Sequence, residues 1–214
     1  MSRRYSAGRN EDRMIQIKMC GLSRQEDITY VNQLLPEYIG FVFYEKSRRN
    51  VSYETAKALK AQLDPRIKAV GVFVDAGASF IKRLTDAGVI DLVQLHGNED
   101  EVYIDCLRHM VQVPVIKAFK VKSAADIARA NESKADYVLL DSGMGTGKTF
   151  DWEMIAGMRR RFFLAGGISA DNAAGAIAKC HPFALDVSSM IETDGVKDPA
   201  KMKAFVAAVR GGRE

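Results

Sequence analysis

Two stretches near the end of the chain contain glycine and serine residues suited to binding a phosphate group. FFLAGGISADN places Gly166 and Gly167 after a short apolar segment, and ALDVSSM places Ser188 and Ser189 after another. Glycine lets the backbone approach a ligand closely, and N–H groups at the start of a helix are oriented donors for an anion. The pattern therefore predicts a site for a phosphate monoester. The alternative is two ordinary strand–helix turns that happen to contain these residues.

Two titratable residues also stand at the ends of apolar segments. Cys20 ends the segment IKMC directly before Gly21, and Asp141 ends YVLLD. A thiol or a carboxyl group in such a position is a candidate for proton transfer. The alternatives are that Cys20 is a small core residue and that Asp141 forms a turn. Cys106 and Cys180 fall in helical patterns, and we assign no chemistry to them.

Further polar residues follow other apolar segments. Gln94 and His96 lie in VQLHGNED, and Arg48 and Arg49 lie in EKSRRNVS. The arginines are either solvated loop charges or ligands of an anion, and His96 is either a hydrogen-bonding loop residue or a catalyst.

Residues 143–149, GMGTGKT, resemble a nucleotide-binding loop only superficially. Three residues rather than four separate Gly143 from Gly147, which is the wrong spacing for that motif. We interpret the glycine-rich stretch as a mobile lid over an active site.

Eight apolar segments of four to seven residues alternate with amphipathic stretches. Short segments rich in Val, Ile, Leu and Phe are typical of buried parallel strands. Helices are expected between them, for example over 52–63 and 79–87, and a last helix over 199–209 has proline in its first turn. The predicted strands are 15–19, 38–43, 68–74, 92–95, 113–118, 137–140, 162–165 and 183–187.

This repetition favours the α/β class and a single (β/α)8 TIM barrel over an open doubly wound sheet, which needs fewer units. In such a barrel the active site lies at the carboxyl ends of the strands, where the residues singled out above fall. We expect the barrel to occupy residues 14–214 and residues 1–13 to form a disordered extension.

Composition narrows the class of protein further. Of the net charge of +4, the first thirteen residues carry +2, from four arginines against Glu11 and Asp12, so nucleic acid is not expected as a partner. No apolar run approaches the ~20 residues of a membrane span, and the N-terminus lacks the apolar core of a signal peptide. The three cysteines are far apart and lack CxxC spacing, so neither a disulfide framework nor a zinc site is indicated. We expect a cytoplasmic protein without membrane contact.

Eight motifs occur in order between about residue 15 and residue 210. They are IKMCGLSRQEDI, GFVFYEKSRRNVS, VGVFVDA, VQLHGNED, VIKAF, LLDSGMGTGKTFDW, FFLAGGISADN and DVSSMIETDGVKD. Together they resemble the phosphoribosylanthranilate isomerase family of tryptophan biosynthesis. AGG and QLHG alone are weakly specific, whereas the whole set is highly specific.

The resemblance implies an Amadori rearrangement of N-(5'-phosphoribosyl)anthranilate to 1-(2-carboxyphenylamino)-1-deoxyribulose 5-phosphate. Cys20 matches the family's general base, and Asp141 matches its general acid. Because no redox step occurs, neither a cofactor nor a metal ion is expected. The state of the barrel, monomer or homodimer, stays open.

The resemblance also implies how the phosphorylated substrate is bound. Arg49 matches an arginine that contacts the anthranilate carboxylate, and Asp186 matches an acid just before the phosphate site. Gln94 and His96 complete the expected substrate-binding set. The phosphate site itself matches at Gly166, Gly167, Ser188 and Ser189.

Met190 departs from the family pattern, which has glycine after the two serines. If this position requires a positive φ, methionine strains the turn by about 1–2 kcal/mol, and its side chain crowds the phosphate. A catalytically silent barrel that binds a phosphorylated ligand is therefore an alternative. A related sugar-phosphate isomerase of histidine biosynthesis is another, although those enzymes use two aspartates and this chain has Cys20.

Nothing in the sequence explains how the Cys20 thiol becomes a base. A thiol has a pKa of ~8.5 and is a poor base at neutral pH unless its thiolate is stabilised. We expect Lys18 on the opposite face of the strand from Cys20, which leaves the thiol without an obvious cationic neighbour.

Overall fold

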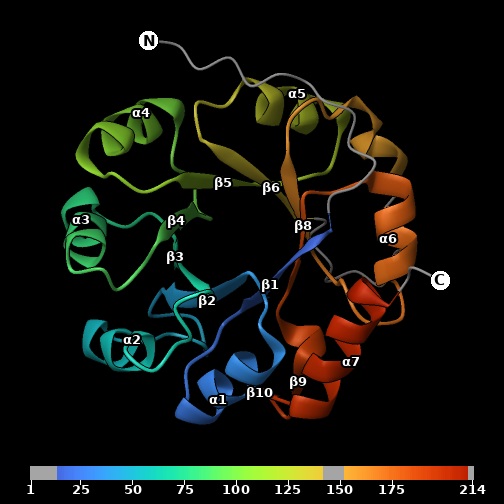
Figure 1. Cartoon of the computed structure of the whole chain (residues 1–214). Coiled ribbons are helices and arrows are strands. Elements are labelled where there is room, and N and C mark those ends of the chain that lie inside the picture. Colours follow the sequence, from blue (N-terminus) through green and yellow to red (C-terminus); the bar gives the residue numbers. More distant parts are fainter. Residues whose placement is uncertain (1–13, 142–151, 212–214) are drawn as a thin grey trace.

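Eight parallel strands close into a barrel in the order β1 to β8, which confirms the predicted fold (Figure 1). The computed structural model describes residues 14–141 and 152–211. The predicted N-terminal extension and the predicted lid lie outside these residues. The strands are β1 (Gln16–Cys20), β2 (Tyr38–Phe43), β3 (Lys68–Phe73), β4 (Leu92–Leu95), β5 (Val115–Lys120), β6 (Tyr137–Asp141), β7 (Phe162–Ala165) and β8 (Ala184–Val187).

Several strand boundaries differ from the predicted ones by one or two residues. β1 and β6 each end one residue later than predicted and thereby include Cys20 and Asp141. β5 begins two residues later than predicted, after Pro114, because proline has no N–H to give to the strand ladder.

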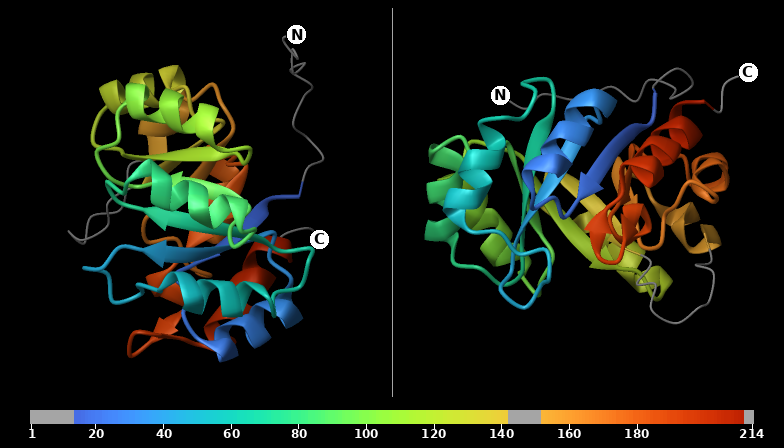
Figure 2. Two further views of the ribbon diagram at one scale, coloured as in Figure 1. Left: turned by 90° about the vertical axis from the view of Figure 1, so that its left-hand side faces the viewer. Right: turned by 90° about the horizontal axis from the view of Figure 1, so that it is seen from below.

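Helices lie outside the strands, as the two side views show (Figure 2). After β6, however, the described residues contain a 3-10 helix, η1 (Trp152–Gly157), so the expectation of an α-helix after every strand fails for residues 152–161. The α-helices are α1 (Gln25–Leu34), α2 (Tyr53–Lys60), α3 (Ala78–Asp86), α4 (Glu101–Met110), α5 (Ala124–Glu132), α6 (Ala173–Cys180) and α7 (Pro199–Arg210).

Local signals explain where several helices begin. The Ser52 hydroxyl accepts a hydrogen bond from the Thr55 N–H at 3.0 Å before α2, as the Ser-x-x-Thr pattern predicts. Asp198 accepts from the Ala200 N–H at 2.8 Å before α7, which starts with Pro199.

Alternation along the strands divides the core into two parts. One set of side chains packs outwards against the helices, and the other fills the barrel interior. The interior cluster consists of Tyr38, Val70, Leu92, Ile116, Ala118, Leu139, Phe163, Ala165 and Ala184. Residues two apart on a strand share a face, so Gln94, Asp141 and Asp186 point into the interior after Leu92, Leu139 and Ala184. The interior therefore becomes polar towards the carboxyl ends of the strands.

A short antiparallel hairpin follows β8 and the 3-10 helix η2 (Ser189–Ile191). Its strands are β9 (Glu192–Thr193) and β10 (Val196–Lys197), which lie between α1 and α7 in Figure 1. Asp194 and Gly195 form the turn with φ of 51° and 82°, the conformation that favours Asp-Gly in two-residue hairpins. This hairpin was not among the elements predicted from the sequence.

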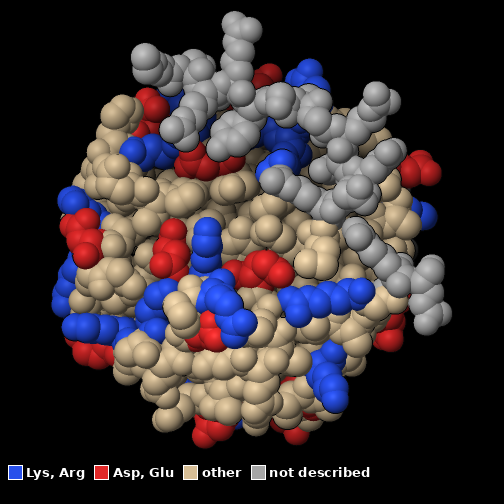
Figure 3. All heavy atoms as spheres, in the orientation of Figure 1, with Lys and Arg blue, Asp and Glu red and all other residues tan. Residues whose placement is uncertain are grey.

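Charged side chains of both signs are interspersed on the face that Figure 3 shows. Many charged side chains of the described residues form ion pairs, for example Lys60 with Asp91 at 2.5 Å and Arg66 with Asp64 at 2.7 Å. Among the described helices, none combines the length and apolar character that a membrane crossing requires.

Candidate active site

Cys20 lies at the carboxyl end of β1, and two glycines make room around it. A Cβ on Gly40 of β2 would lie 2.6 Å from the Cys20 sulfur. Gly21 has a φ of 83°, and a Cβ there would lie 2.3 Å from Cδ of Arg49. The Cys-Gly pair of the sequence therefore serves packing: glycine turns the chain and lets the Arg49 side chain approach the thiol.

Lys18 is a direct neighbour of Cys20, so the expectation that it faces away was wrong. Residues two apart on a strand share a face, and Lys18 pairs in register with Tyr38 and Asp186, both of which face the barrel interior. The Lys18 Nζ donates to Oδ2 of Asp186 at 2.8 Å, and its positive charge lies near enough to the Cys20 sulfur to act on the thiol. The three side chains form one buried group.

Burial and charge act in opposite directions on this group. Burial raises the pKa of the Cys20 thiol above its ordinary value, while Lys18 and Lys197 work against that rise. Burial opposes the charge on Lys18, but the negative charges of Asp186 and Cys20 outweigh it and raise the pKa of Lys18. The pKa of Asp186 is raised by burial, and Lys18 counteracts this.

Asp141, at the end of β6, belongs to a second chain of polar contacts. The Gln94 amide Nε2 donates to Nδ1 of His96 at 3.1 Å, and Nε2 of His96 lies 3.2 Å from Oδ2 of Asp141. An amide nitrogen can only donate, so a neutral His96 carries its proton on Nε2 and donates it to the carboxylate. The structure thus joins Asp141 to Gln94 and His96, which the sequence places in a different segment.

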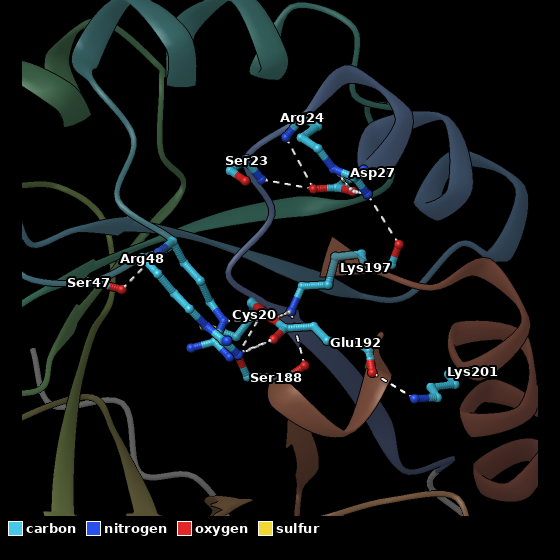
Figure 4. A network of polar contacts seen from close by, with 11 residues as sticks. Cys20, Ser23, Arg24, Asp27, Ser47, Arg48, Ser188, Glu192, Lys197 and Lys201 are labelled. Atoms are coloured by element: carbon cyan, nitrogen blue, oxygen red, sulfur yellow. Dashed lines mark hydrogen bonds and ion pairs between the residues drawn. The ribbon is translucent and has the colours of Figure 1, made fainter. Parts of the chain in front are cut away.

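Glu192 on β9 gathers three cationic side chains (Figure 4). Arg49 donates from Nε and Nη2 to its two oxygens at 2.6 and 2.8 Å, and Lys197 donates at 2.7 Å. Arg48 donates at 2.7 Å but is 59% exposed. Burial alone would raise the pKa of Glu192; the hydrogen bonds from Arg49 and Lys197 outweigh burial and lower that pKa to about 2.

The hairpin also connects to Cys20 and to α1. Lys197 Nζ donates to the Ser188 carbonyl at 3.0 Å, and the Ser188 hydroxyl donates to the Cys20 carbonyl at 3.1 Å. Arg24, before α1, donates to the Lys197 carbonyl at 3.1 Å (Figure 4). The hairpin therefore links the arginine loop to the end of β1.

The predicted phosphate residues follow the neighbouring strands β7 and β8. Gly166 and Gly167 have φ of 88° and 65°, and Ser188 and the exposed Ser189 follow β8. The Asn172 side chain accepts from the Ser169 N–H and donates to the Gly167 carbonyl, both at 2.9 Å, which closes the glycine turn. Phosphate binding at these turns stays a prediction.

A pocket of about 590 Å³ lies beside His96, with Lys117, Phe119 and Lys120 in its wall. Within residues 14–141 and 152–211, no group of three or more His, Cys, Asp and Glu side chains is arranged to bind a metal ion.

Comparisons with known proteins identify the family. The family model described as N-(5'-phosphoribosyl)anthranilate (PRA) isomerase matches residues 17–208. The PRA isomerase of Endomicrobium trichonymphae is 43% identical over 202 residues, which cover 92% of this chain and 99% of the relative. This chain belongs to the PRA isomerase family.

Solved structures of the family agree. The PRA isomerase of Thermotoga maritima superposes with a TM-score of 0.83 at 34% identity, covering 92% of this chain and all of the relative. A PRA isomerase solved in complex with reduced 1-(o-carboxyphenylamino)-1-deoxyribulose 5-phosphate superposes with a TM-score of 0.81 at 33% identity and the same coverage.

Met190, where the PRA isomerase family usually has glycine, is not strained. It lies in the 3-10 helix η2 and is absent from the residues with positive φ, and its side chain is 46% exposed. A right-handed helical conformation is open to every L-residue, so the condition on which the expected strain depended is not met.

Three charged residues of the site were not predicted to belong to it: Lys18, Glu192 and Lys197. A lysine within an apolar strand, two positions before the cysteine, was the signal for the first. The Asp-Gly pair in ETDGVK was the signal for the hairpin that carries the other two.

Proposed function

We propose that this protein catalyses the Amadori rearrangement of N-(5'-phosphoribosyl)anthranilate to 1-(2-carboxyphenylamino)-1-deoxyribulose 5-phosphate in tryptophan biosynthesis. The supporting observation is that Cys20 and Asp141 end strands β1 and β6 of one barrel. Asp141 lies 3.2 Å from Nε2 of His96, and Cys20 shares a strand face with the buried ion pair of Lys18 and Asp186. β7 and β8 stand between these two strands, so an acid and a base can approach a sugar from different sides.

The reaction needs one proton donor and one proton acceptor. Asp141, protonated, gives its proton to the furanose ring oxygen, and the C1'–O bond breaks to leave a Schiff base with the anthranilate nitrogen. The Cys20 thiolate then removes the proton from C2', and the electron pair forms the enolamine. Tautomerisation of the enolamine gives the ketone, with no change in the number of electrons.

The partners of Asp141 suit this role. His96 donates to one carboxyl oxygen and is itself oriented by Gln94. A carboxyl group oriented by a hydrogen bond is positioned to meet one atom of the substrate. Gln94 and His96 thus act on the reaction by positioning Asp141, and His96 also borders the pocket.

Substrate binding is assigned to the surrounding charged and glycine-rich elements. Arg49 binds the anthranilate carboxylate, with Glu192 holding two of its nitrogens. Asp186 has one buried oxygen, Oδ1, with no hydrogen-bond partner among the described residues, and it accepts from a polar group of the substrate. The phosphate is bound at Gly166, Gly167, Ser188 and Ser189. The relative solved with a reduced carboxyphenylamino-deoxyribulose phosphate supports this class of ligand.

The proposal requires no cofactor and no metal ion, because the electrons stay within the substrate. A cytoplasmic location and a monomer or homodimer fit a biosynthetic barrel of this size, and gel filtration distinguishes the two states.

The test is the loss of fluorescence of freshly generated phosphoribosylanthranilate in the presence of the purified protein. We expect the parent protein to accelerate the decay, and Asp141→Asn and Cys20→Ser to lose most of that turnover while still binding a reduced product analogue. Near-parent turnover in either variant would remove that residue from its role. Binding without decay in the parent would favour the silent barrel. The absence of both decay and binding in the parent would refute the proposed activity.

A further inference from the structure

The group around Cys20 contains an ammonium that the reaction scheme does not use. Lys18 is 0% exposed, and its Nζ donates to Asp186 at 2.8 Å. Cys20 lies two residues further along the same face of β1, where the charge of Lys18 acts on it. Burying a lysine is costly unless its charge is compensated. Asp186 supplies one compensating charge, and the position of the Cys20 sulfur offers a second.

Charge balance at this site favours an ionised sulfur. The described charged groups that face Cys20 are Lys18 from β1, Asp186 from β8, Lys197 from β10 and Arg49 from the loop after β2. With Glu192, which pairs with Arg49 and Lys197, they comprise three cations and two carboxylates. Arg48, which also pairs with Glu192, is left out of this count because its side chain is 59% exposed and solvated. A thiol leaves the set with one positive charge in excess, whereas a thiolate neutralises it. Further from the sulfur, His96 and Asp141 face Asp186.

We propose that Lys18 is a positioning residue that stabilises the thiolate of Cys20 against the effect of burial and so raises the thiolate fraction, and that Asp186 keeps the Lys18 ammonium in place. The thiol proton leaves to solvent, Lys18 keeps all its protons, and no bond other than S–H is broken. The proposal rests on the proposed function only for its effect on turnover, because the charge state of Cys20 can be measured without substrate.

The competing interpretation is that Lys18 and Asp186 only fill the barrel interior as an ion pair. Lys117 provides a matched control for that interpretation. Its Nζ donates to Glu99 at 2.7 Å, and it too is buried, but it lies between Ile116 and Ala118 and therefore on the opposite face of β5 from the barrel interior. Lys117→Met removes a buried ammonium without touching the surroundings of Cys20.

The experiment is a pH titration of the ultraviolet absorbance of the Cys20 thiolate, taken as the difference between each protein and its Cys20→Ser counterpart. We expect Lys18→Met to raise the titration midpoint by about one pH unit or more. At pH values below the midpoint, this shift lowers the thiolate fraction about tenfold. Asp186→Asn should lower the midpoint, because it removes a negative charge and leaves the ammonium. Lys117→Met should leave it unchanged, and Lys18→Arg should restore part of the shift.

Turnover gives a second readout. If Cys20 is the base, Lys18→Met shifts the rising limb of the kcat–pH profile upwards by the same amount, with little change in the Michaelis constant. If Lys18→Met does not fold, Lys18→Gln is used instead, because its amide can still donate to Asp186 while the positive charge is removed.

The proposal is overturned if the Cys20 midpoint in the Lys18 variant that lacks the positive charge coincides with that of the parent, or if Lys117→Met shifts it equally. These outcomes are separate from the test of the activity. A shifted midpoint in a protein whose Cys20→Ser variant still turns over would uphold the inference and refute the role of Cys20 as base.

Discussion

Replacing Glu192 by glutamine tests how the site is held together. The substitution keeps the shape of the side chain but removes the negative charge shared by Arg49 and Lys197. Lys197 is buried, so its ammonium loses its compensating carboxylate. Arg48 is mostly solvated, and its ion pair contributes little.

The magnitude follows from the pKa of Glu192, which falls from 4.5 to about 2 on folding. At ~1.36 kcal/mol per pKa unit, this shift contributes about 3 kcal/mol to the free energy of unfolding. Breaking a buried ion pair by removing one partner costs a similar amount, about 3–5 kcal/mol. For a domain of this size, 3 kcal/mol lowers the melting temperature by about 6–12 °C.

The pH dependence has a defined sign. Because the folded pKa is depressed, the stabilisation is complete above the unfolded value of 4.5 and is lost as the pH falls through about 2. The difference in free energy of unfolding between the parent and Glu192→Gln should therefore be about 3 kcal/mol at about pH 7 and only about 1 kcal/mol near pH 3.

Urea denaturation of both proteins across this pH range measures the difference. Glu45→Gln is the control, because Glu45 is exposed in the same loop as the two arginines and undergoes the same chemical change. A decrease in the free energy of unfolding of less than about 1 kcal/mol at neutral pH would refute the assignment of Glu192 as the charge that holds this cluster, and so would a decrease that does not change with pH.

Three further substitutions test other parts of the structure. Gly40→Ala should lower kcat at least about tenfold while the fold is kept, because its Cβ would lie 2.6 Å from the Cys20 sulfur and must displace it; parent-like turnover would show that the thiol tolerates a shift. Phe163 packs in the interior against Tyr38, Tyr137 and Phe183, so Phe163→Ala should lower the free energy of unfolding, measured by urea denaturation, by about 3–5 kcal/mol. A decrease below about 1 kcal/mol would contradict its central place in the packing. Met190→Gly should leave the Michaelis constant within about twofold and cost at most about 1 kcal/mol of stability, since η2 is unstrained; a markedly lower Michaelis constant would mean that methionine does crowd the phosphate.

The sequence by itself determined the barrel and most of the chemistry-bearing positions. Short apolar segments at regular spacing predict parallel strands, and the carboxyl ends of such strands meet at one end of a barrel. Cys20, His96 and Asp141 could therefore be assigned to one site although they are far apart in the chain. Boundaries were less certain where proline intervenes, as at Pro114, because hydrogen bonding between strands sets them.

The tertiary structure alone decided which charges meet. Lys18 and Asp186 are 168 residues apart, and Arg49 and Glu192 are 143 apart. Closure of the barrel sets β8 beside β1, and the register of that pair brings Lys18 opposite Asp186. No local pattern encodes such a pairing, because it depends on strand register, on ring closure and on the direction of each side chain. The sequence thus predicted a cysteine at the mouth of the barrel, whereas only the fold revealed the buried cations around its sulfur.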